Sequence, residues 1–200
     1  MARLLFTGRE FGSLADPIDP GNSRKLNNLL ALPVVFMHQS HGNEVALVEN
    51  ETIFPEADAL VTTNKNIALA VRVADCLPLL LASQNVVAAV HVGRRGLMNQ
   101  VALKAVSLMK QLGADQISGV VGPHICGECY EVDSQTYADV CSTYPATGQK
   151  NNYLNLYQGL EEQLGDISLE NLNLCTKENS GYFSHRANAE LGRQVGVISL

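Results

Sequence analysis

Residues 67–96, IALAVRVADCLPLLLASQNVVAAVHVGRRG, form the most apolar part of this chain and indicate its fold class. It contains three apolar runs of strand length, at residues 67–73, 77–82 and 86–90. The residues between the runs, including Asp75 and the polar segment 83–85, favour turns. Runs this apolar predict strands that are buried on both faces. The stretch therefore predicts a sheet between helical layers, in an α/β or α+β fold.

Weaker patterns on both sides of this stretch extend the sheet and add helices. Further strands are predicted at residues 34–37, 44–48, 58–62, 117–121 and 195–200. Helices are predicted at residues 22–30, at residues 96–112 and from near Asp133 onward. Pro33 and Gly113 follow the first two helices and would end them. No repeat or linker divides the 200 residues, so we expect a single domain spanning residues 1–200.

The composition is typical of a folded globular protein, with 46% hydrophobic and 17% charged residues. A net charge of −6 without a basic stripe argues against a nucleic-acid partner, because binding to phosphate backbones requires clustered Lys and Arg. No stretch is long and apolar enough to predict a membrane span or a signal peptide. We therefore expect a cytoplasmic protein with small-molecule substrates, whose five cysteines are reduced.

Three residues form the first candidate site: His41, Cys76 and His91. Each lies at the edge of an apolar run or in a glycine turn. One thiolate and two imidazoles suit a tetrahedral zinc ion that keeps its fourth position open, which is typical of catalytic zinc. Their separations, 35 and 15 residues, match no compact zinc motif, and His38 is close enough to compete with His41. Taken singly, each residue also fits a purely structural role.

A basic turn follows His91 directly, in the sequence Gly93-Arg94-Arg95-Gly96. Two arginines at the start of a predicted helix favour an anion such as phosphate. A solvent-exposed turn with two surface arginines is an equally good interpretation of this segment alone.

The second candidate site is the CxxC segment formed by Cys126 and Cys129. A redox CxxC requires a helix that begins at the first cysteine, and the β-favouring residues 130–132 give no sign of one. A structural zinc site requires a second ligand pair, and Cys141 and Cys175 do not form one along the sequence. We therefore interpret this CxxC as an accident of a cysteine-bearing loop.

The motifs considered together carry a family resemblance. They are QSHG (39–42), DALVT (58–62), ADCLP (74–78), HVGRRG (91–96), GPHI (122–125), CYEV (129–132), CT (175–176) and FSHR (183–186). In this order, from about Phe6 to Arg193, they resemble the YfiH-type laccase-domain family, variously called polyphenol oxidase, purine nucleoside phosphorylase and peptidoglycan editing factor. The resemblance implies an α-β-β-α layered sandwich. It also implies a zinc ion bound by the histidine of QxHG, the cysteine of ADCLP and the histidine of HxGxRG, which are His41, Cys76 and His91.

The resemblance also implies an activity, because members of the family are reported to cleave purine nucleosides with phosphate and to deaminate adenosine. We therefore expect a zinc-dependent purine nucleoside phosphorylase with adenosine deaminase activity. In this hypothesis the three zinc ligands and Arg95 are catalytic. Arg9, Arg94 and Arg95 would bind phosphate.

The chain departs from the family pattern at the rim of the expected site. Arg94 stands where the family usually has tryptophan, Lys177 replaces an aromatic residue after Cys175-Thr176, and His185 replaces a tyrosine before Arg186. The first of these changes removes an aromatic wall and adds a charge, which favours a more anionic substrate.

Three other functions stay open at this point. Cys76 and His91 could form the nucleophile and base of a metal-free hydrolase or amidase that acts on cell-wall precursors. Copper-dependent polyphenol oxidation is less favoured, because one ligand trio does not hold the several copper ions of a laccase. The chain could also be a non-catalytic protein that binds zinc or a nucleoside.

Overall fold

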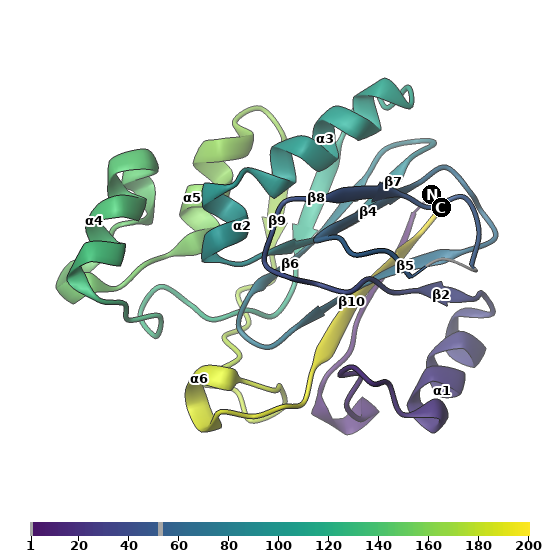
Figure 1. Cartoon of the computed structure of the whole chain (residues 1–200), viewed down its shortest axis with the longest axis horizontal. Coiled ribbons are helices and arrows are strands. Elements are labelled where there is room, and N and C mark those ends of the chain that lie inside the picture. The colour runs from purple at the N-terminus through teal and green to yellow at the C-terminus, as the bar shows by residue number, and fades with distance from the viewer. Residues whose placement is uncertain (1, 52–53) are drawn as a thin grey trace.

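The computed structural model describes residues 2–51 and 54–200. Two β-sheets lie face to face, and each carries helices on its outer side (Figure 1). The order of layers is helices, six-stranded sheet, four-stranded sheet, helix. This arrangement confirms the predicted α-β-β-α sandwich.

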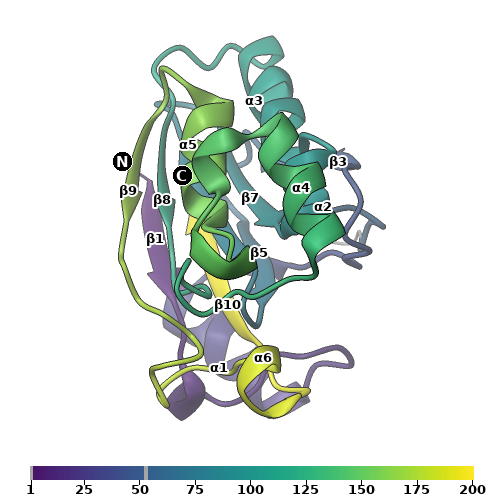
Figure 2. The same ribbon diagram turned by 90° about the vertical axis from the view of Figure 1, so that its left-hand side faces the viewer.

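The six-stranded sheet contains two of the three apolar runs of residues 67–96, as strands β6 (Leu77–Ala82) and β7 (Val87–Val92). Its strands, in spatial order, are β3 (Val45–Leu47), β4 (Ala59–Thr62), β7, β6, β8 (Ser118–Val121) and β9 (Ser168–Asn171). The four central strands pair antiparallel, whereas the edge strands β3 and β9 run parallel to their neighbours. Figure 2 shows β8 and β9 side by side at one edge of the molecule.

The four-stranded sheet joins the two ends of the chain. Its strands, in spatial order, are β1 (Arg3–Phe6), β10 (Gln194–Ser199), β5 (Ala68–Val73) and β2 (Val34–Val35). The last strand, β10, lies between β1 and β5 and pairs antiparallel with both. The start of β1 therefore lies beside the end of β10, where Arg3 pairs with Ser199 (Figure 1).

Helices cover the outer faces of both sheets. Four helices cover the outer face of the six-stranded sheet: α2 (Arg94–Met98), α3 (Val101–Gln111), α4 (Ser134–Thr143) and α5 (Leu156–Leu164). The four-stranded sheet carries α1 (Pro20–Leu30), and the short α6 (His185–Asn188) lies near the start of β10. Three 3₁₀ turns complete the elements, at Arg9–Phe11, Pro145–Thr147 and Lys150–Asn152. No helix in the described part of the chain is long and apolar enough to cross a membrane.

Alternating side chains of the central strands build separate cores. In β6, Leu79 and Leu81 pack toward the helices, while Leu80 packs against the other sheet. In β5, Leu69 faces the space between the sheets and Ala70 faces α1. Because successive strand residues point to opposite faces, both faces of these strands are covered. The prediction of strands buried on both faces is confirmed.

The structure differs from the predicted elements in two respects. The helix predicted over residues 96–112 is two helices in the structure. Gln100 adopts a left-handed conformation with φ 62°, and this residue separates α2 from α3. Strands β1 and β9 and helix α5 were not predicted, since each is short or carries many polar residues. The helix expected near Asp133 is α4, and the Asp133 side chain accepts a hydrogen bond from the Thr136 amide at its start.

Candidate functional site

His41, Cys76 and His91 come together at one end of the six-stranded sheet. One ligand atom from each residue lies within 4.8 Å of the other two. The Cys76 Sγ is 4.0 Å from His41 Nε2, and the two imidazole rings meet edge to face with centroids 4.6 Å apart. The structure therefore brings together the whole predicted trio.

Strand pairing explains this placement. In the antiparallel pair β6–β7, Leu77 lies opposite Val92, so Cys76 just before β6 lies next to the end of β7 that carries His91. His41 reaches the same point from a turn, where its φ is 59°. At Gly93 an added Cβ would lie 2.9 Å from the Cys76 Sγ, so only glycine lets the chain pass this close to the cluster.

Asp58 supports the cluster from behind. Its carboxylate is 2.8 Å from His91 Nδ1 and accepts hydrogen bonds from the backbone amides of His41 and Gly42 at 3.0 and 2.7 Å. Burial alone would raise the pKa of Asp58, but these hydrogen bonds and the charge of His91 lower it to about 2. An ionised Asp58 keeps a proton on His91 Nδ1, so Nε2 is the ring nitrogen that would bind a metal in exchange for its own proton.

The thiol and the imidazoles also affect one another's charge. Burial opposes the charged form of both Cys76 and His91, yet their mutual attraction lowers the pKa of Cys76 to about 6 and raises the pKa of His91 to about 9. Cys76 is therefore a thiolate at neutral pH, which is the form that binds metals. A metal ion would displace the proton from His91 Nε2 and bind the neutral imidazole.

The cluster opens into a cavity of about 700 Å³, which lies within the range of about 300–1,000 Å³ typical of small-molecule sites. Its wall includes Tyr130, Ile125 and five arginines: Arg72, Arg94, Arg95, Arg186 and Arg193. Arg186 donates to the Glu131 carbonyl at 2.7 Å and packs over the Tyr130 ring. Within the described part of the chain, the Arg95 guanidinium makes no hydrogen bond or ion pair and is free to meet a ligand.

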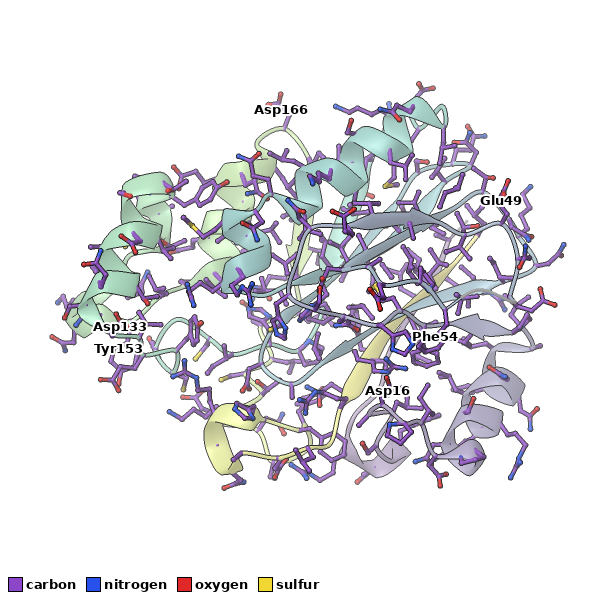
Figure 3. All side chains as sticks on the ribbon, viewed as in Figure 1. Asp16, Glu49, Phe54, Asp133, Tyr153 and Asp166 are labelled. Carbon is purple, nitrogen blue, oxygen red and sulfur yellow. The ribbon has the colours of Figure 1, made fainter. Side chains whose placement is uncertain are left out.

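Two residues considered from the sequence, Arg9 and His38, do not belong to the metal-ligand cluster. Arg9 is not part of the cavity wall: it forms an ion pair with Glu190 at 2.8 Å and packs over the Phe183 ring. His38 lines the cavity but does not join the cluster, because its Nδ1 lies 3.2 Å from Asp16 and its ring packs against Phe54 at 4.4 Å. Figure 3 labels Asp16 and Phe54, which lie near each other.

A second cluster includes both cysteines of the CxxC segment. The described residues include one other group with metal-ligating atoms, all within 4.8 Å of one another: Cys126, Cys129, Cys175 and Glu178. Sequence spacing could not reveal this group, since Cys126 and Cys175 are 49 residues apart and meet only through the parallel pairing of β8 and β9. The CxxC segment is therefore not an isolated feature of its loop.

Two supporting residues were missed from the sequence. Asp58 is the first residue of the motif DALVT. Its position directly before a fully buried strand is the sequence feature that could have indicated a functional aspartate. Thr176 is buried, and its hydroxyl donates to the Asp75 carboxylate at 2.7 Å. Asp75 also accepts from the Arg186 amide and has a φ of 89°, so it fixes the backbone directly before Cys76.

The chain is similar in sequence to two proteins named purine nucleoside phosphorylase. The chain is 39% identical over 181 residues to the purine nucleoside phosphorylase SCO2081 of Streptomyces coelicolor, which covers 84% of this chain and 75% of that protein. It is 34% identical over 197 residues to the purine nucleoside phosphorylase Cgl2154/cg2365 of Corynebacterium glutamicum, which covers 90% and 80% of the two chains.

Solved structures show the same fold. Neisseria meningitidis protein NMB0706, of the DUF152 family, matches with a TM-score of 0.85 and 25% identity over 100% of this chain and 94% of its own. The Bacillus licheniformis hypothetical protein YfiH matches with a TM-score of 0.85 and 24% identity, over 100% and 92%. Residues 20–200 match the family described as Multi-copper polyphenol oxidoreductase laccase. The chain therefore belongs to this laccase-domain family, which confirms the predicted YfiH-type resemblance.

Proposed function

We propose that the protein is a zinc-dependent purine nucleoside phosphorylase, which converts adenosine or inosine and phosphate into the free base and ribose 1-phosphate. One observation carries this proposal: the His41, Cys76 and His91 cluster opens into a cavity of about 700 Å³ whose wall holds Arg94 and Arg95. The names of the relatives from Streptomyces coelicolor and Corynebacterium glutamicum support the same reaction.

The cluster fits a catalytic zinc ion. It offers one sulfur and two nitrogens, and its remaining side faces the cavity, which matches the three protein ligands and one open position of such sites. Zinc bound there would act as a Lewis acid toward an oxygen of the substrate. Multi-copper oxidation requires further histidine-rich sites, and the other cluster in the described part of the chain contains no histidine. Because Cys76 must stay a free thiol, we place the protein in the reducing cytoplasm.

The residues of the cavity wall supply binding and orientation. Arg95, with Arg94 beside it, would hold phosphate through charge-assisted hydrogen bonds. Tyr130 and Ile125 offer apolar surface for the purine ring. A phosphate oxygen then bonds to the anomeric carbon of the ribose while the bond from that carbon to the purine nitrogen breaks, and the departing base takes up a proton. Arg9 has no part in this scheme, because its guanidinium is held by Glu190 outside the cavity.

Deamination of adenosine is the second activity that we propose for this site. The same open cavity would accept the purine ring against the metal cluster, with water replacing the amino group and ammonia leaving. Product analysis separates the two activities, because phosphorolysis of adenosine gives adenine, whereas deamination gives inosine.

The test is release of the base from inosine and adenosine by protein purified without an affinity tag. We expect release to require phosphate, to yield ribose 1-phosphate, to stop after chelation and to return when zinc is added. Zinc-loaded protein that releases no base in phosphate buffer would contradict the proposal.

A metal-free cysteine hydrolase is the second candidate, and one observation favours it. Cys76, His91 and Asp58 are arranged like the nucleophile, base and orienting acid of a catalytic triad, with Asp58 2.8 Å from His91. This function predicts that chelation leaves activity toward an amide substrate intact and that alkylation of Cys76 abolishes it. The phosphorylase predicts loss of activity after either treatment.

A further inference from the structure

The second cluster lies outside the cavity and has no part in the proposed reaction. We propose that it is a structural zinc site whose ligands come from two loops: Cys126, Cys129, Cys175 and Glu178. The zinc would fasten the loop that follows β8 to the loop that follows β9. This proposal does not depend on which reaction the cavity supports.

The positions of the ligand atoms fit a tetrahedral zinc ion. Zinc–sulfur bonds of about 2.3 Å place two sulfurs about 3.8 Å apart. The four candidate atoms lie within 4.8 Å of one another, so they need to close by about an ångström or less. Three thiolates and one carboxylate complete the four-coordinate set of a closed structural site, and soft sulfur ligands favour zinc over magnesium or calcium.

The backbone holds the three thiols together independently of any ligand. The pairing of β8 and β9 continues past the strands as a parallel bridge between His124 and Cys175. The His124 amide donates to the Leu174 carbonyl, and the Thr176 amide donates to the His124 carbonyl, both at 3.0 Å. Two segments that are distant in sequence are thus aligned so that their cysteines face one another.

The local hydrogen bonds also suit thiolate ligands. The Cys126 amide donates to the Cys175 Sγ at 3.4 Å, and such a bond stabilises negative charge on sulfur. Gly127 lets this loop lie against Asn155, since an added Cβ would be only 2.7 Å from the Asn155 Cβ. Lys177 reaches the Cys129 carbonyl at 3.5 Å and places a positive charge beside a ligand set that is strongly negative.

A disulfide explains the cluster less well. It would join two of the three sulfurs and give no role to the third thiol or to the Glu178 carboxylate, although all four groups converge. All five cysteines are free thiols in the structure. Zinc accounts for every member of the group.

The site would act on the catalytic cluster through Asp75. Ile125, directly before Cys126, donates its amide to the Asp75 carbonyl at 2.9 Å. Thr176, directly after Cys175, donates its hydroxyl to the Asp75 carboxylate at 2.7 Å. Both loops thus hold the residue that precedes Cys76, so a metal that fixes the loops would steady the backbone of a catalytic ligand.

Metal analysis of purified variants tests this proposal. We expect about two zinc ions per wild-type chain and about one in Cys76→Ala, in which the cavity site is lost. The double variant Cys129→Ser/Cys175→Ser should also retain about one. Cys141→Ser is the matched control, because Cys141 lies outside both clusters. Glu178→Gln should release zinc to a chelator faster than the wild type does, and Glu128→Gln, on the same depression, should not.

A spectroscopic measurement keeps the test independent of folding defects in the double variant. Cys76→Ala leaves the second cluster intact, so X-ray absorption at the zinc edge of this variant should show about three sulfur neighbours. Absence of zinc from this variant, or zinc without sulfur neighbours, would overturn the proposal. So would mass spectrometry showing a disulfide among the three cysteines in freshly purified protein.

Discussion

The two cysteine-containing clusters differ in what surrounds them. The cluster of His41, Cys76 and His91 opens into a large cavity and is supported by a buried aspartate, Asp58. Five arginines share its cavity. Cys126, Cys175 and Glu178 of the other cluster line a depression between two loops. Among the described residues, no arginine lines this depression, and Lys177 lies beside the cluster at the Cys129 carbonyl.

This difference fits the two proposals, in which the cavity cluster is catalytic and the second cluster is structural. A metal with two imidazoles, one thiolate and an open side can bind a substrate oxygen, whereas a metal enclosed by four protein ligands has no free position. The arginines strengthen the contrast, because they line the cavity and not the depression at the second cluster. Changes at the two clusters should therefore differ in their effects on turnover, metal binding and stability.

The largest effect is expected from Cys76→Ala. Removing a ligand should cost more than losing an outer hydrogen-bond partner, which costs about 10–100-fold, so we expect phosphorolysis to fall by more than about 100-fold. Metal content and base release are measured on the same sample. Cys141→Ala should keep full activity, and a Cys76→Ala protein with wild-type turnover would remove the distinction between the clusters.

The next effect is expected from Asp58→Asn. The amide group cannot accept the His91 Nδ1 proton and three backbone amide protons as the carboxylate does, so we expect zinc affinity at the cavity to fall by about 10–100-fold. Competition with a chromophoric chelator measures this affinity. Asp166→Asn, at an exposed position that Figure 3 labels, is the control. Equal weakening of both zinc sites by Asp58→Asn would contradict the account.

Arg95→Ala tests the anion-binding side of the comparison. Loss of a hydrogen bond to a charged group costs about 1.5–3 kcal/mol, so the KM for phosphate should rise by about tenfold or more. Steady-state kinetics at varied phosphate and fixed inosine measure this change. Metal content should stay unchanged, and Lys104→Ala on the exposed side of α3 should leave the KM unaltered. A normal phosphate KM in Arg95→Ala would show that phosphate binds elsewhere.

Thr176→Val tests the connection between the two clusters. The change keeps the shape of the side chain but removes the hydroxyl that donates to Asp75, at a cost of about 1–3 kcal/mol in the free energy of unfolding. Urea unfolding measures this cost, and turnover should fall only a few fold because both metal sites remain. Thr143→Val, at an exposed position on α4, should change neither quantity. Loss of zinc from the cavity in Thr176→Val would contradict this expectation, because it would show that the cavity site depends on Thr176 by more than one hydrogen bond.

The smallest effect concerns pH. The pKa of Asp58 falls from 3.8 to about 2 on folding, so the unfolded chain binds its proton more readily than the folded chain does. The resulting stabilisation is complete above the unfolded pKa and is lost as the pH falls through about 4 toward 2. Urea unfolding of metal-free protein should therefore show a difference between wild type and Asp58→Asn that shrinks between pH 6 and pH 3. A difference in unfolding free energy that stays constant over this pH range would contradict the claim that Asp58 is ionised in the folded protein.

Sequence patterns predicted the features that depend on residues close to one another along the chain. The apolar runs gave the central strands, and the residues at their ends gave the trio of His41, Cys76 and His91. The helix over residues 96–112 was predicted as one element, because periodicity does not register the left-handed backbone of Gln100. Arg9 was predicted at the phosphate site, but its nearest charge partner, Glu190, is set by the path of the C-terminal loops.

The second cluster shows why the rest required the structure. Cys126 and Cys129 are visible as a CxxC segment, but Cys175 joins them only through the pairing of β8 with β9. The role of Asp58 likewise depends on the pairing of Ala59 with Val90, which brings the aspartate beside His91. Contacts of this kind arise between strands that are distant in sequence, so no local pattern contains them.

Anomalous diffraction at the zinc edge, from crystals of protein purified without a tag, would locate zinc ions at the two clusters. We expect one peak bounded by Cys76, His41 and His91, with its open side toward the cavity. We expect a second peak enclosed by the sulfurs of Cys126, Cys129 and Cys175. A cavity cluster without a peak, or with a peak only at the copper edge, would contradict the assignment of catalytic zinc to this cluster.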